Sequence, residues 1–466
     1  MSDRVDVVIV GAGPAGMTAA IKARELGAKS VVVLDEQTSA GGQIWRNIEH
    51  ASRKISTILG PDYVAGAKVA SAFRKANVDH IDGAMVWNIT QDKVLNYVRH
   101  GKSYELHAKT VLLCTGAQER PFPIPGWTLP GVMTAGAAQV LLKGNGVAAA
   151  QPPVLIGCGP LLYLLCWQYL RAGIRVGAIL DTTSARDYLQ AIPDLGSAIR
   201  GWRYLKKGIA LISEIKKEKI PFHRGVRDLK LSGDSHVSSV EFQCRGTTER
   251  IDTNLVFLHQ GVVPNTQFTW ALRAKHRWSE KQLCWIPDVD ETGQLIGIEG
   301  IYVAGDGRGI VGANAAVYQG ELAAVSALTK LGILSRRKGD DAIMHIRKKL
   351  SREVAVRPFL ETVYKPQDEN RIPVSDSVTV CRCEELKAGE IRQFVAEGCQ
   401  GPNQAKSFGR CGMGPCQGRM CGLTVTELMA RELGCSPTGV GYYRIRAPIK
   451  PITLAELATI EEFPSS

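Results

Sequence analysis

The stretch Val5-Asp6-Val7-Val8-Ile9-Val10-Gly11-Ala12-Gly13-Pro14-Ala15-Gly16 decides the fold. Its first half is an apolar strand pattern, and an apolar helix pattern follows over residues 17–26. In such a unit the first glycine permits a tight turn, the second lets the backbone approach a diphosphate, and the third lets helix and strand pack closely. We therefore predict a dinucleotide whose diphosphate lies at the helix N-terminus, bound by Gly11, Gly13, Pro14, Ala15 and Gly16.

A second strand pattern over residues 31–34 ends in two acids, Asp35 and Glu36. In this kind of unit an acid at the end of the second strand accepts hydrogen bonds from the ribose hydroxyls, and both residues fit the spacing. The sequence does not choose between them. A lone glycine pattern can be only a turn, but the flanking strands, the helix and the acid together favour nucleotide binding.

The same pattern occurs a second time from Val154 onward, with the loop Gly157-Cys158-Gly159-Pro160. Leu162 stands where the third glycine belongs, and the second strand of the repeat ends in Asp181. A leucine at that position would crowd the helix against the strand or against a ligand. Two interpretations of the second fold stay open: a packing role and a working nucleotide site.

The composition is that of an ordinary globular protein. The chain has 466 residues, of which 45% are hydrophobic and 22% charged, so we expect several domains with sizeable cores. The formal net charge is +12, but the basic residues are spread along the chain, and we expect no nucleic-acid partner. The apolar stretch at 161–170 is too short to span a bilayer, and residues 1–6 lack a signal-peptide pattern. We expect no transmembrane segment and a cytoplasmic location.

Two later strand patterns each end in a turn, at Thr115-Gly116 and at Gly305-Asp306. Together with the two glycine loops, these motifs resemble the two-dinucleotide-fold flavoproteins related to glutathione reductase, over residues 4–330. The resemblance implies FAD as the ligand, with all four of these residues beside it and Asp306 at the ribityl or phosphate region. Alternatively, Asp306 serves only as a turn or helix N-cap residue.

Five of the twelve cysteines gather after residue 380: Cys381, Cys383, Cys411, Cys416 and Cys421. Thiolates at this density suit an iron–sulfur cluster or zinc, since either takes four soft ligands from separate chain segments. Five candidates compete for four places. No Cys-x-x-Cys or Cys-x4-Cys pair occurs before residue 380, so the redox disulfide of a disulfide reductase is not expected.

The spacing of these cysteines resembles that of the bacterioferritin-associated ferredoxin fold, which holds a 2Fe-2S cluster. There a Cys-x-Cys pair precedes a closer pair, and the 32 residues between Cys383 and Cys416 match its interval better than the 27 up to Cys411. The resemblance implies Cys381, Cys383, Cys416 and Cys421 as ligands, with Cys411 in reserve. The closing Cys-x4-Cys is wider than in that ferredoxin and is similar to the C-terminal region of the A subunit of anaerobic glycerol-3-phosphate dehydrogenase.

Over nearly its full length the chain resembles the A subunits of opine oxidases and the B subunit of hydrogen cyanide synthase. The stretches that carry this resemblance are 35–37, Gly41-Gly42-Gln43-Ile44, 401–404 and 441–443, so Gly42 and Gln43 join the expected FAD site. The resemblance implies an electron-transferring subunit that works with a second, substrate-oxidising flavoprotein subunit. Some such complexes have FMN between the two subunits, together with a small third subunit.

The reaction implied is oxidation of a carbon–nitrogen bond in a small amine: an opine, amino acid or imino acid such as octopine, nopaline or hydroxyproline. No general base paired with a substrate-clamping arginine is recognisable, so no catalytic residue is assigned. The alternative is a self-contained NAD(P)H-dependent FAD reductase that feeds electrons to its own 2Fe-2S cluster. Neither the substrate, the terminal electron acceptor nor the subunit stoichiometry follows from the sequence.

The expected fold class is α/β, with two Rossmann-like dinucleotide-binding domains and a small C-terminal, helical, cysteine-rich iron–sulfur module. We predict that the FAD-binding domain comprises residues 1–130 and 286–335, with the second nucleotide-binding-like domain at 131–285. A helical linker is predicted at 336–375, and the 2Fe-2S-binding module at 376–466.

Overall fold

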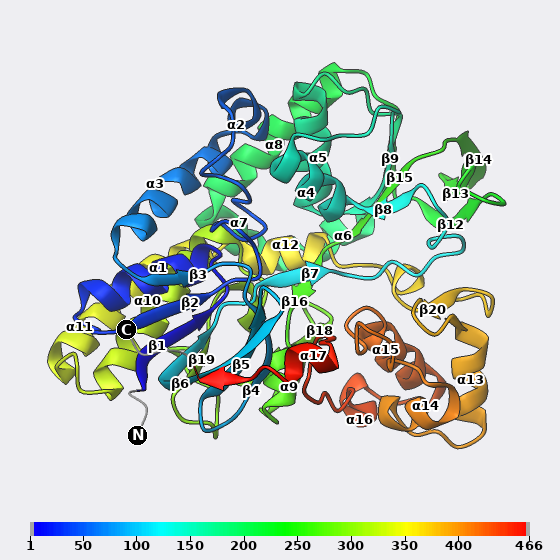
Figure 1. Ribbon diagram of the computed structural model, residues 1–466. Helices are drawn as coiled ribbons and strands as arrows, with labels where there is room; N and C mark the ends of the chain where they lie inside the picture. The colour runs from blue at the N-terminus through cyan, green and yellow to red at the C-terminus, as the bar shows by residue number, and fades with distance from the viewer. Residues whose placement is uncertain (1–3, 463–466) are drawn as a thin grey trace.

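Strand β6 (Lys102–Leu113) organises the larger of the two main sheets in the computed structural model (Figure 1). Its C-terminal half pairs in parallel with β1 and β19, and its N-terminal half pairs antiparallel with β5. The strand order is β3-β2-β1-β6-β5-β4, with β19 and β22 also paired to β6. The bounds are β1 Val5–Val10, β2 Val31–Leu34, β3 Asp79–Ile81, β4 Met85–Ile89, β5 Val94–Arg99, β19 Ile301–Val303 and β22 Glu461–Glu462. The structure describes residues 4–462, so residues 1–3 and 463–466 of the first and last predicted domains lie outside the described part.

The two faces of this sheet have different neighbours because side chains alternate along a strand. Val7 and Ile9 pack beneath helices α1 (Pro14–Glu25) and α10 (Ala313–Lys330). These helices cross closely, since a Cβ on Gly320 would lie 2.1 Å from the carbonyl oxygen of Ala15. Val8 and Val10 belong instead to a core shared with the C-terminal cysteine-rich region. The nucleotide fold and the cysteines therefore share one hydrophobic core.

The second main sheet is parallel, with the order β11-β10-β9-β15-β8. One face packs on helix α5, and the other packs on a three-stranded antiparallel sheet. Parallel strands covered by helices in both main sheets confirm the predicted α/β class. The bounds are β8 Val132–Thr134, α4 Ala135–Asn145, β9 Val154–Cys158, α5 Pro160–Arg171, β10 Ala178–Asp181, α6 Ala185–Gln190, α7 Leu195–Arg200, α8 Trp202–Lys217, β11 Phe222–Arg224, β12 Arg227–Ser232, β13 Ser239–Cys244, β14 Thr247–Asp252 and β15 Val256–Gln260.

The chain crosses between the two sheets at β7 (Ala117–Glu119) and β16 (Val262–Pro264), which pair antiparallel. After α10 the chain forms α11 (Arg336–Glu353) and α12 (Arg357–Val363). The cysteine-rich region follows, at the lower right of Figure 1. The remaining bounds are α2 Arg53–Leu59, α3 Pro61–Lys75, α9 Gln267–Ala271, β17 His276–Ser279, β18 Cys284–Pro287, β20 Thr379–Cys381, β21 Leu386–Lys387, α13 Ala388–Ala396, α14 Pro402–Gly409, α15 Gly422–Glu432, α16 Pro437–Val440 and α17 Leu454–Leu457.

The C-terminal segment returns to the first sheet. The amide of Ile449 donates to the carbonyl oxygen of Trp87 at 2.9 Å, and β22 pairs with the start of β6. The C-terminal end of the cysteine-rich region is therefore tied to the nucleotide fold. Among residues 4–462, no helix is both long enough and apolar enough to cross a membrane.

Candidate functional site

The loop between β1 and α1 has the geometry that a dinucleotide site requires. Gly11 has a φ of 102°, and a Cβ there would lie 2.5 Å from the carbonyl oxygen of Cys114. A Cβ on Gly16 would lie 1.8 Å from the carbonyl oxygen of Gly11. Both positions need glycine because backbone atoms on both sides cannot move apart without separating helix and strand. Pro14 and Ala15 form the first turn of α1, where a missing N–H costs nothing.

Gly13 differs from its two neighbours because the protein itself does not require glycine there. Its φ is −75°, and the nearest atom to a methyl group added at this position would be the Cα of Gly42, at 3.8 Å. Gly42 faces it with a φ of 58°, and the amide of Gly41 donates to the carbonyl oxygen of Ala12 at 2.8 Å. The segment that carries Gly42 and Gln43 therefore lies against the glycine loop. The missing side chain at Gly13 leaves room for a ligand.

The two acids after β2 have different environments. Asp35 is buried, and its carboxylate accepts hydrogen bonds from the amides of Ala12 and of Gln37, the latter at 2.7 Å. Burial raises the pKa of Asp35, and the amide hydrogen bonds oppose that rise. The side chain of Glu36 is 52% exposed and forms an ion pair with Lys450 from the C-terminal segment. The geometry makes Asp35 a support of the loop and favours Glu36 as the acid that faces a ribose.

The other predicted FAD residues gather at the same end of the sheet. A Cβ on Gly305 would lie 3.1 Å from the Cβ of Ala15, so the turn η2 (Gly305–Arg308) lies against the start of α1. A Cβ on Gly307, in the same turn, would lie 3.5 Å from Thr115 Oγ1 and 3.6 Å from the carbonyl oxygen of Gly116.

Asp306 organises the turn that follows β19. Its Oδ1 accepts hydrogen bonds from the amides of Val311 at 2.8 Å and Gly312 at 3.0 Å. The carboxylate thus has the turn role of the alternative interpretation, and Val311, one of its two hydrogen-bond partners, lines a cavity of about 440 Å³. This cavity is lined in part by Trp278, Gln282, Arg308, Val311, Gln319 and Glu361.

In the second fold, Leu162 and Asp181 are both engaged by other parts of the protein. Leu162 is fully buried in the core. The buried carboxylate of Asp181 accepts hydrogen bonds from the hydroxyl of Tyr163 at 2.5 Å and from the amide of Thr183 at 2.8 Å. Both oxygens of this acid are therefore already paired within the protein.

The segment that contains α12 covers the second glycine loop. The thiol of Cys158 lies 3.6 Å from the carbonyl oxygen of Tyr364, and Gln367 donates to the carboxylate of Asp187 at 3.1 Å. The tilted rings of Tyr364 and Tyr163 also lie next to each other, with their centroids 6.4 Å apart. These contacts favour the packing role for the second fold.

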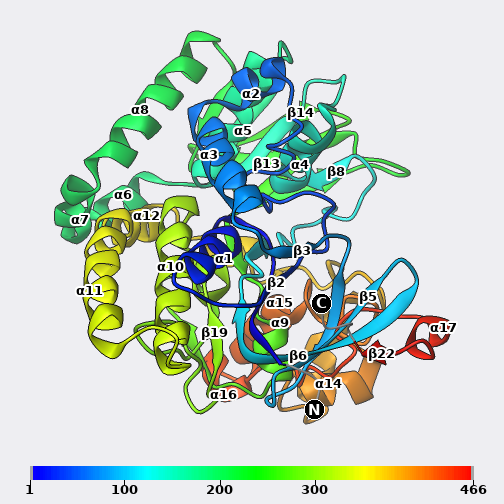
Figure 2. The same ribbon diagram turned by 60° about the vertical axis from the view of Figure 1, so that its left-hand side comes forward.

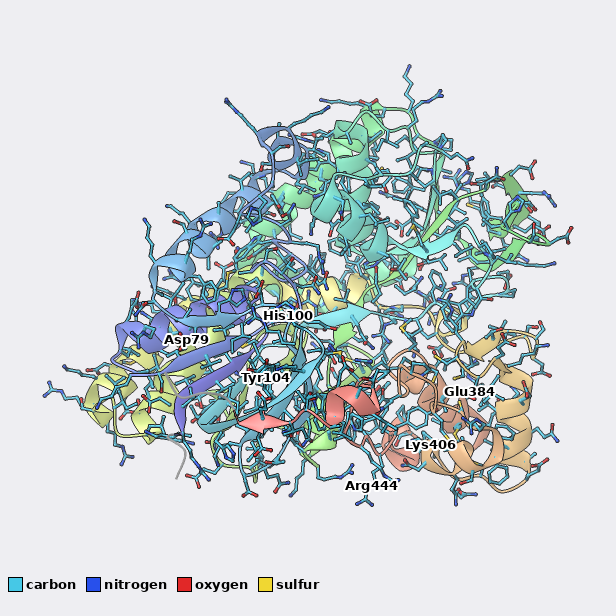
Figure 3. All side chains as sticks on the ribbon, viewed as in Figure 1. Asp79, His100, Tyr104, Glu384, Lys406 and Arg444 are labelled. Atoms are coloured by element: carbon cyan, nitrogen blue, oxygen red, sulfur yellow. The ribbon has the colours of Figure 1, made fainter. Side chains whose placement is uncertain are left out.

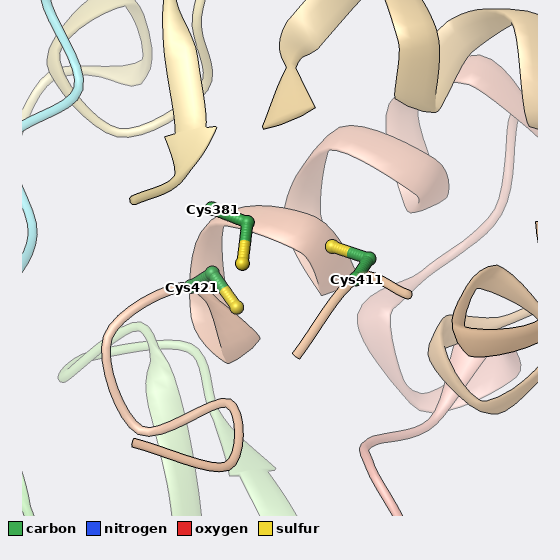
Figure 4. Close-up of side chains that lie close together, drawn as sticks. All are labelled: Cys381, Cys411 and Cys421. Atoms are coloured by element: carbon green, nitrogen blue, oxygen red, sulfur yellow. The ribbon is translucent and has the colours of Figure 1, made fainter. Parts of the chain in front are cut away.

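The five clustered cysteines form two groups. Cys381, Cys411 and Cys421 are buried, and their sulfur atoms all lie within 4.8 Å of one another. Figure 4 shows the sulfur atoms of Cys381 and Cys421 close together, with that of Cys411 pointing toward them. Cys383 is exposed and Cys416 half-buried, with 3.9 Å between their sulfur atoms. The expected reserve ligand, Cys411, thus lies beside two of the predicted ligands, and the other two predicted ligands form the second group.

The donor set fits a metal that prefers sulfur. Hydrogen bonds from Cys411 and Cys421 lower the pKa of the Cys381 thiol, which favours the thiolate that metals bind. Glycine makes the close approach of the two chain segments possible, because a Cβ on Gly414 would lie 2.2 Å from the Cβ of Cys383. Which four of the five cysteines bind stays a prediction.

Tyr443 lies in this site, although no role was predicted for it. Its hydroxyl donates to the sulfur of Cys411 at 3.2 Å and lies 3.8 Å from that of Cys421. The ring is seated on two glycines, since a Cβ on Gly412 or Gly418 would lie 2.5 Å from it. The ammonium nitrogen of Lys406, labelled in Figure 3, lies 5.0 Å from the ring centroid. The only sequence signal was the Gly441-Tyr442-Tyr443 stretch, which carried resemblance without a role.

These elements define a class, the flavoprotein oxidoreductases with two dinucleotide folds. The sequence profile described as Pyridine nucleotide-disulphide oxidoreductase matches residues 5–320, and that of the Sarcosine oxidase A3 domain matches residues 377–460. The chain belongs to the pyridine nucleotide-disulphide oxidoreductase family, within its group of opine oxidase A subunits, and is an FAD-dependent oxidoreductase. The predicted family resemblance is thereby confirmed.

Two relatives support this assignment, and one solved structure shares the fold. The chain is 43% identical to the A subunit of opine oxidase from Agrobacterium tumefaciens, over 98% of this chain and 92% of that protein. It is 30% identical to hydrogen cyanide synthase subunit HcnB of Pseudomonas aeruginosa, over 96% of both. The fold also matches the crystal structure of L-proline dehydrogenase from P. horikoshii, with a TM-score of 0.71 at 19% identity, over 98% of this chain and 79% of that one.

Proposed function

We propose that this chain is the electron-transferring flavin and iron–sulfur subunit of a multi-subunit enzyme that oxidises a carbon–nitrogen bond. The substrate class is an opine, amino acid or imino acid, such as octopine, nopaline or hydroxyproline. One observation carries the proposal: a cysteine cluster shares a chain and a hydrophobic core with the FAD fold, in a protein 43% identical to the A subunit of an opine oxidase.

In this proposal the predicted site residues hold FAD. The amides at the start of α1 would bind the diphosphate, Glu36 the ribose, and Asp306 would face the ribityl chain at the cavity. Bound FAD accepts a hydride and can give up electrons singly, which the protein residues do not do. The proposed FAD contacts are Gly11, Gly13, Pro14, Ala15, Gly16, Asp35, Glu36, Gly42, Gln43, Thr115, Gly116, Gly305 and Asp306.

We propose a 2Fe-2S cluster for the cysteines. The spacing favours Cys381, Cys383, Cys416 and Cys421, and the sulfur distances add Cys411 as a competitor for one of these places. All-sulfur coordination from two chain segments suits such a cluster. The domain boundaries predicted from the sequence, FMN at a subunit interface and a cytoplasmic location belong to the same proposal.

The proposed partners are a second flavoprotein subunit, which oxidises the substrate, and a small third subunit. The relatives named above are themselves subunits. Helices α6–α8 offer a surface for such a partner, because five large apolar residues there are between 54% and 72% exposed. A single-chain protein rarely exposes such a patch, and Figure 2 shows α8 at the outer edge of the molecule. These residues are Leu189, Ile192, Ile199, Trp202 and Ile209.

The alternative function, a self-contained NAD(P)H-dependent reductase, has less support. It needs a working second nucleotide site. At that site Leu162 stands in place of the third glycine and is buried in the core, and Tyr364 covers the loop. Rapid bleaching of the flavin by NADH or NADPH would favour it over our proposal.

The test is purification of the native complex, with mass spectrometry of its subunits and analysis of flavin, iron and sulfide. We expect FAD and two iron atoms per copy of this chain, and substrate oxidation with a dye acceptor only when the second subunit is present. Oxidation of octopine, nopaline or hydroxyproline by this chain alone would refute the division of labour. Zinc in place of iron would remove the electron-transfer role.

A further inference from the structure

Five aromatic side chains run from the cavity beside Asp306 to the cysteine cluster. Trp278 lines the cavity, and its ring centroid lies 5.6 Å from that of Trp285. Trp285 lies 5.6 Å from Trp270, which stacks on Tyr442 at 5.1 Å. Tyr442 lies 5.8 Å from Tyr443. The rings form one continuous file through the protein.

The two ends of this file meet the two proposed cofactor sites. At one end, the cavity that Trp278 lines is also lined by Val311, whose amide donates to Asp306. At the other end, the hydroxyl of Tyr443 donates to the sulfur of Cys411 at 3.2 Å. The file therefore connects a cavity beside the turn that Asp306 organises with the cysteine cluster.

Packing alone does not account for the choice of residues. The indole N–H groups of Trp270 and Trp285 are buried without a hydrogen-bond partner among residues 4–462, and an unpaired buried donor is unfavourable. An aliphatic or phenyl side chain would fill a core without that cost. The rings also come from three separate segments: α9, the β17–β18 hairpin and the segment after α16. Gly422 is needed to seat Tyr442, because a Cβ there would lie 2.3 Å from its hydroxyl.

We propose that this file of rings is the path by which single electrons pass from the flavin to the iron–sulfur cluster; the inference rests on the proposed function. In each transfer the reduced flavin loses one electron, and one iron(III) of the cluster becomes iron(II). A one-electron acceptor, such as a redox dye, reoxidises the cluster between transfers. Two transfers return the flavin to its oxidised form, with release of its protons to solvent. The rings provide packed π orbitals for tunnelling and are not themselves consumed.

The test interrupts the file at its centre in the full chain loaded with FAD and iron. Trp270→Leu removes a ring, Trp270→Phe keeps one, and Trp167→Leu is the control, because Trp167 is another half-buried tryptophan outside the file. After photoreduction of the flavin, cluster reduction is followed by rapid-freeze EPR. We expect Trp270→Leu to slow it about tenfold or more, with the other two variants within about twofold of the unmodified chain.

A second variant tests the cluster end of the file. Tyr443→Phe keeps the ring but removes the hydrogen bond to Cys411, so we expect a more negative midpoint potential and altered EPR g values. The path would be overturned, and the proposed function would stand, if Trp270→Leu and the unmodified chain reduced the cluster at equal rates and Tyr443→Phe left the EPR spectra unchanged. A chain that binds no iron would overturn both.

Discussion

Substitution of Gly13 by alanine separates the needs of the ligand from those of the fold. The backbone at Gly13 has a φ of −75°, which alanine adopts readily, and the added methyl group would have its nearest neighbour at 3.8 Å. The apoprotein should therefore fold normally. Alanine gives the unfolded chain less conformational freedom than glycine does. We therefore expect the free energy of unfolding without FAD to stay equal or to rise by about 0.4–1 kcal/mol.

The loss should appear only when FAD is present. At a free FAD concentration 100 times the Kd, binding stabilises the folded state by about 2.7 kcal/mol. If the methyl group takes the place of the diphosphate and raises the Kd about 100-fold, only about 0.4 kcal/mol remains at the same concentration. By contrast, Gly16→Ala would place a Cβ 1.8 Å from the carbonyl oxygen of Gly11, and overpacking should cost about 1–3 kcal/mol even without FAD.

Two measurements check this pair of variants: the Kd from quenching of flavin fluorescence, and thermal unfolding with and without FAD. Gly208→Ala is the matched control, because Gly208 lies in α8 with open space around it and far from the loop in sequence. A Kd for Gly13→Ala within about twofold of the unmodified chain would refute the placement of the diphosphate at this loop.

Three further predictions concern the acids, the cysteines and a buried lysine. Asp35→Asn should destabilise the apoprotein by about 1–3 kcal/mol, since Ala12 and Gln37 donate to different oxygens of Asp35 and the change replaces one of these acceptors with an NH₂ donor. Glu36→Gln should leave apoprotein stability unchanged and raise the Kd for FAD; thermal melts and titrations that gave the reverse order would contradict our assignment. Cys411→Ser should lose more iron per chain than Cys383→Ser by elemental analysis, because Cys411 lies in the buried group; the opposite order would support the ligands expected from spacing. Burial, with a smaller contribution from Arg46, lowers the pKa of Lys143 to about 7 from 10.5, so the folded chain binds fewer protons than the unfolded chain between these values. The free energy of unfolding should therefore rise with pH across that window, by at most about 1.4 kcal/mol per unit, and Lys143→Met should remove that contribution in denaturant titrations at several pH values.

The fold class and the family were predictable from the sequence because they depend on local order. A strand, a glycine loop and a helix that follow one another within a few residues can form only a small number of arrangements. Gly16 is needed because of a backbone contact with Gly11 inside that unit, so its role is visible before any distant residue is placed, whereas the close contact of Gly11 is with Cys114, at the end of a distant strand. The sequence also predicted that cysteines after residue 380 act as a group, since thiols at that density have few other uses.

The sequence could not determine how distant segments meet. Asp35 and Glu36 are adjacent, and only folding decides that the first turns inward to two amides while the second meets Lys450. The covering of the second loop by Tyr364 depends on where α12 packs, which no local pattern encodes.

The sequence by itself therefore determined the dinucleotide fold around Gly11 and Gly16, because the strand, the loop and the helix of that unit follow one another along the chain. The tertiary structure alone decided that Cys411 lies with Cys381 and Cys421, and that Trp270 stacks on Tyr442 across more than 150 residues of chain. The physical reason is that side-chain contacts between remote segments depend on how whole helices and sheets pack, and spacing in the sequence does not carry that information.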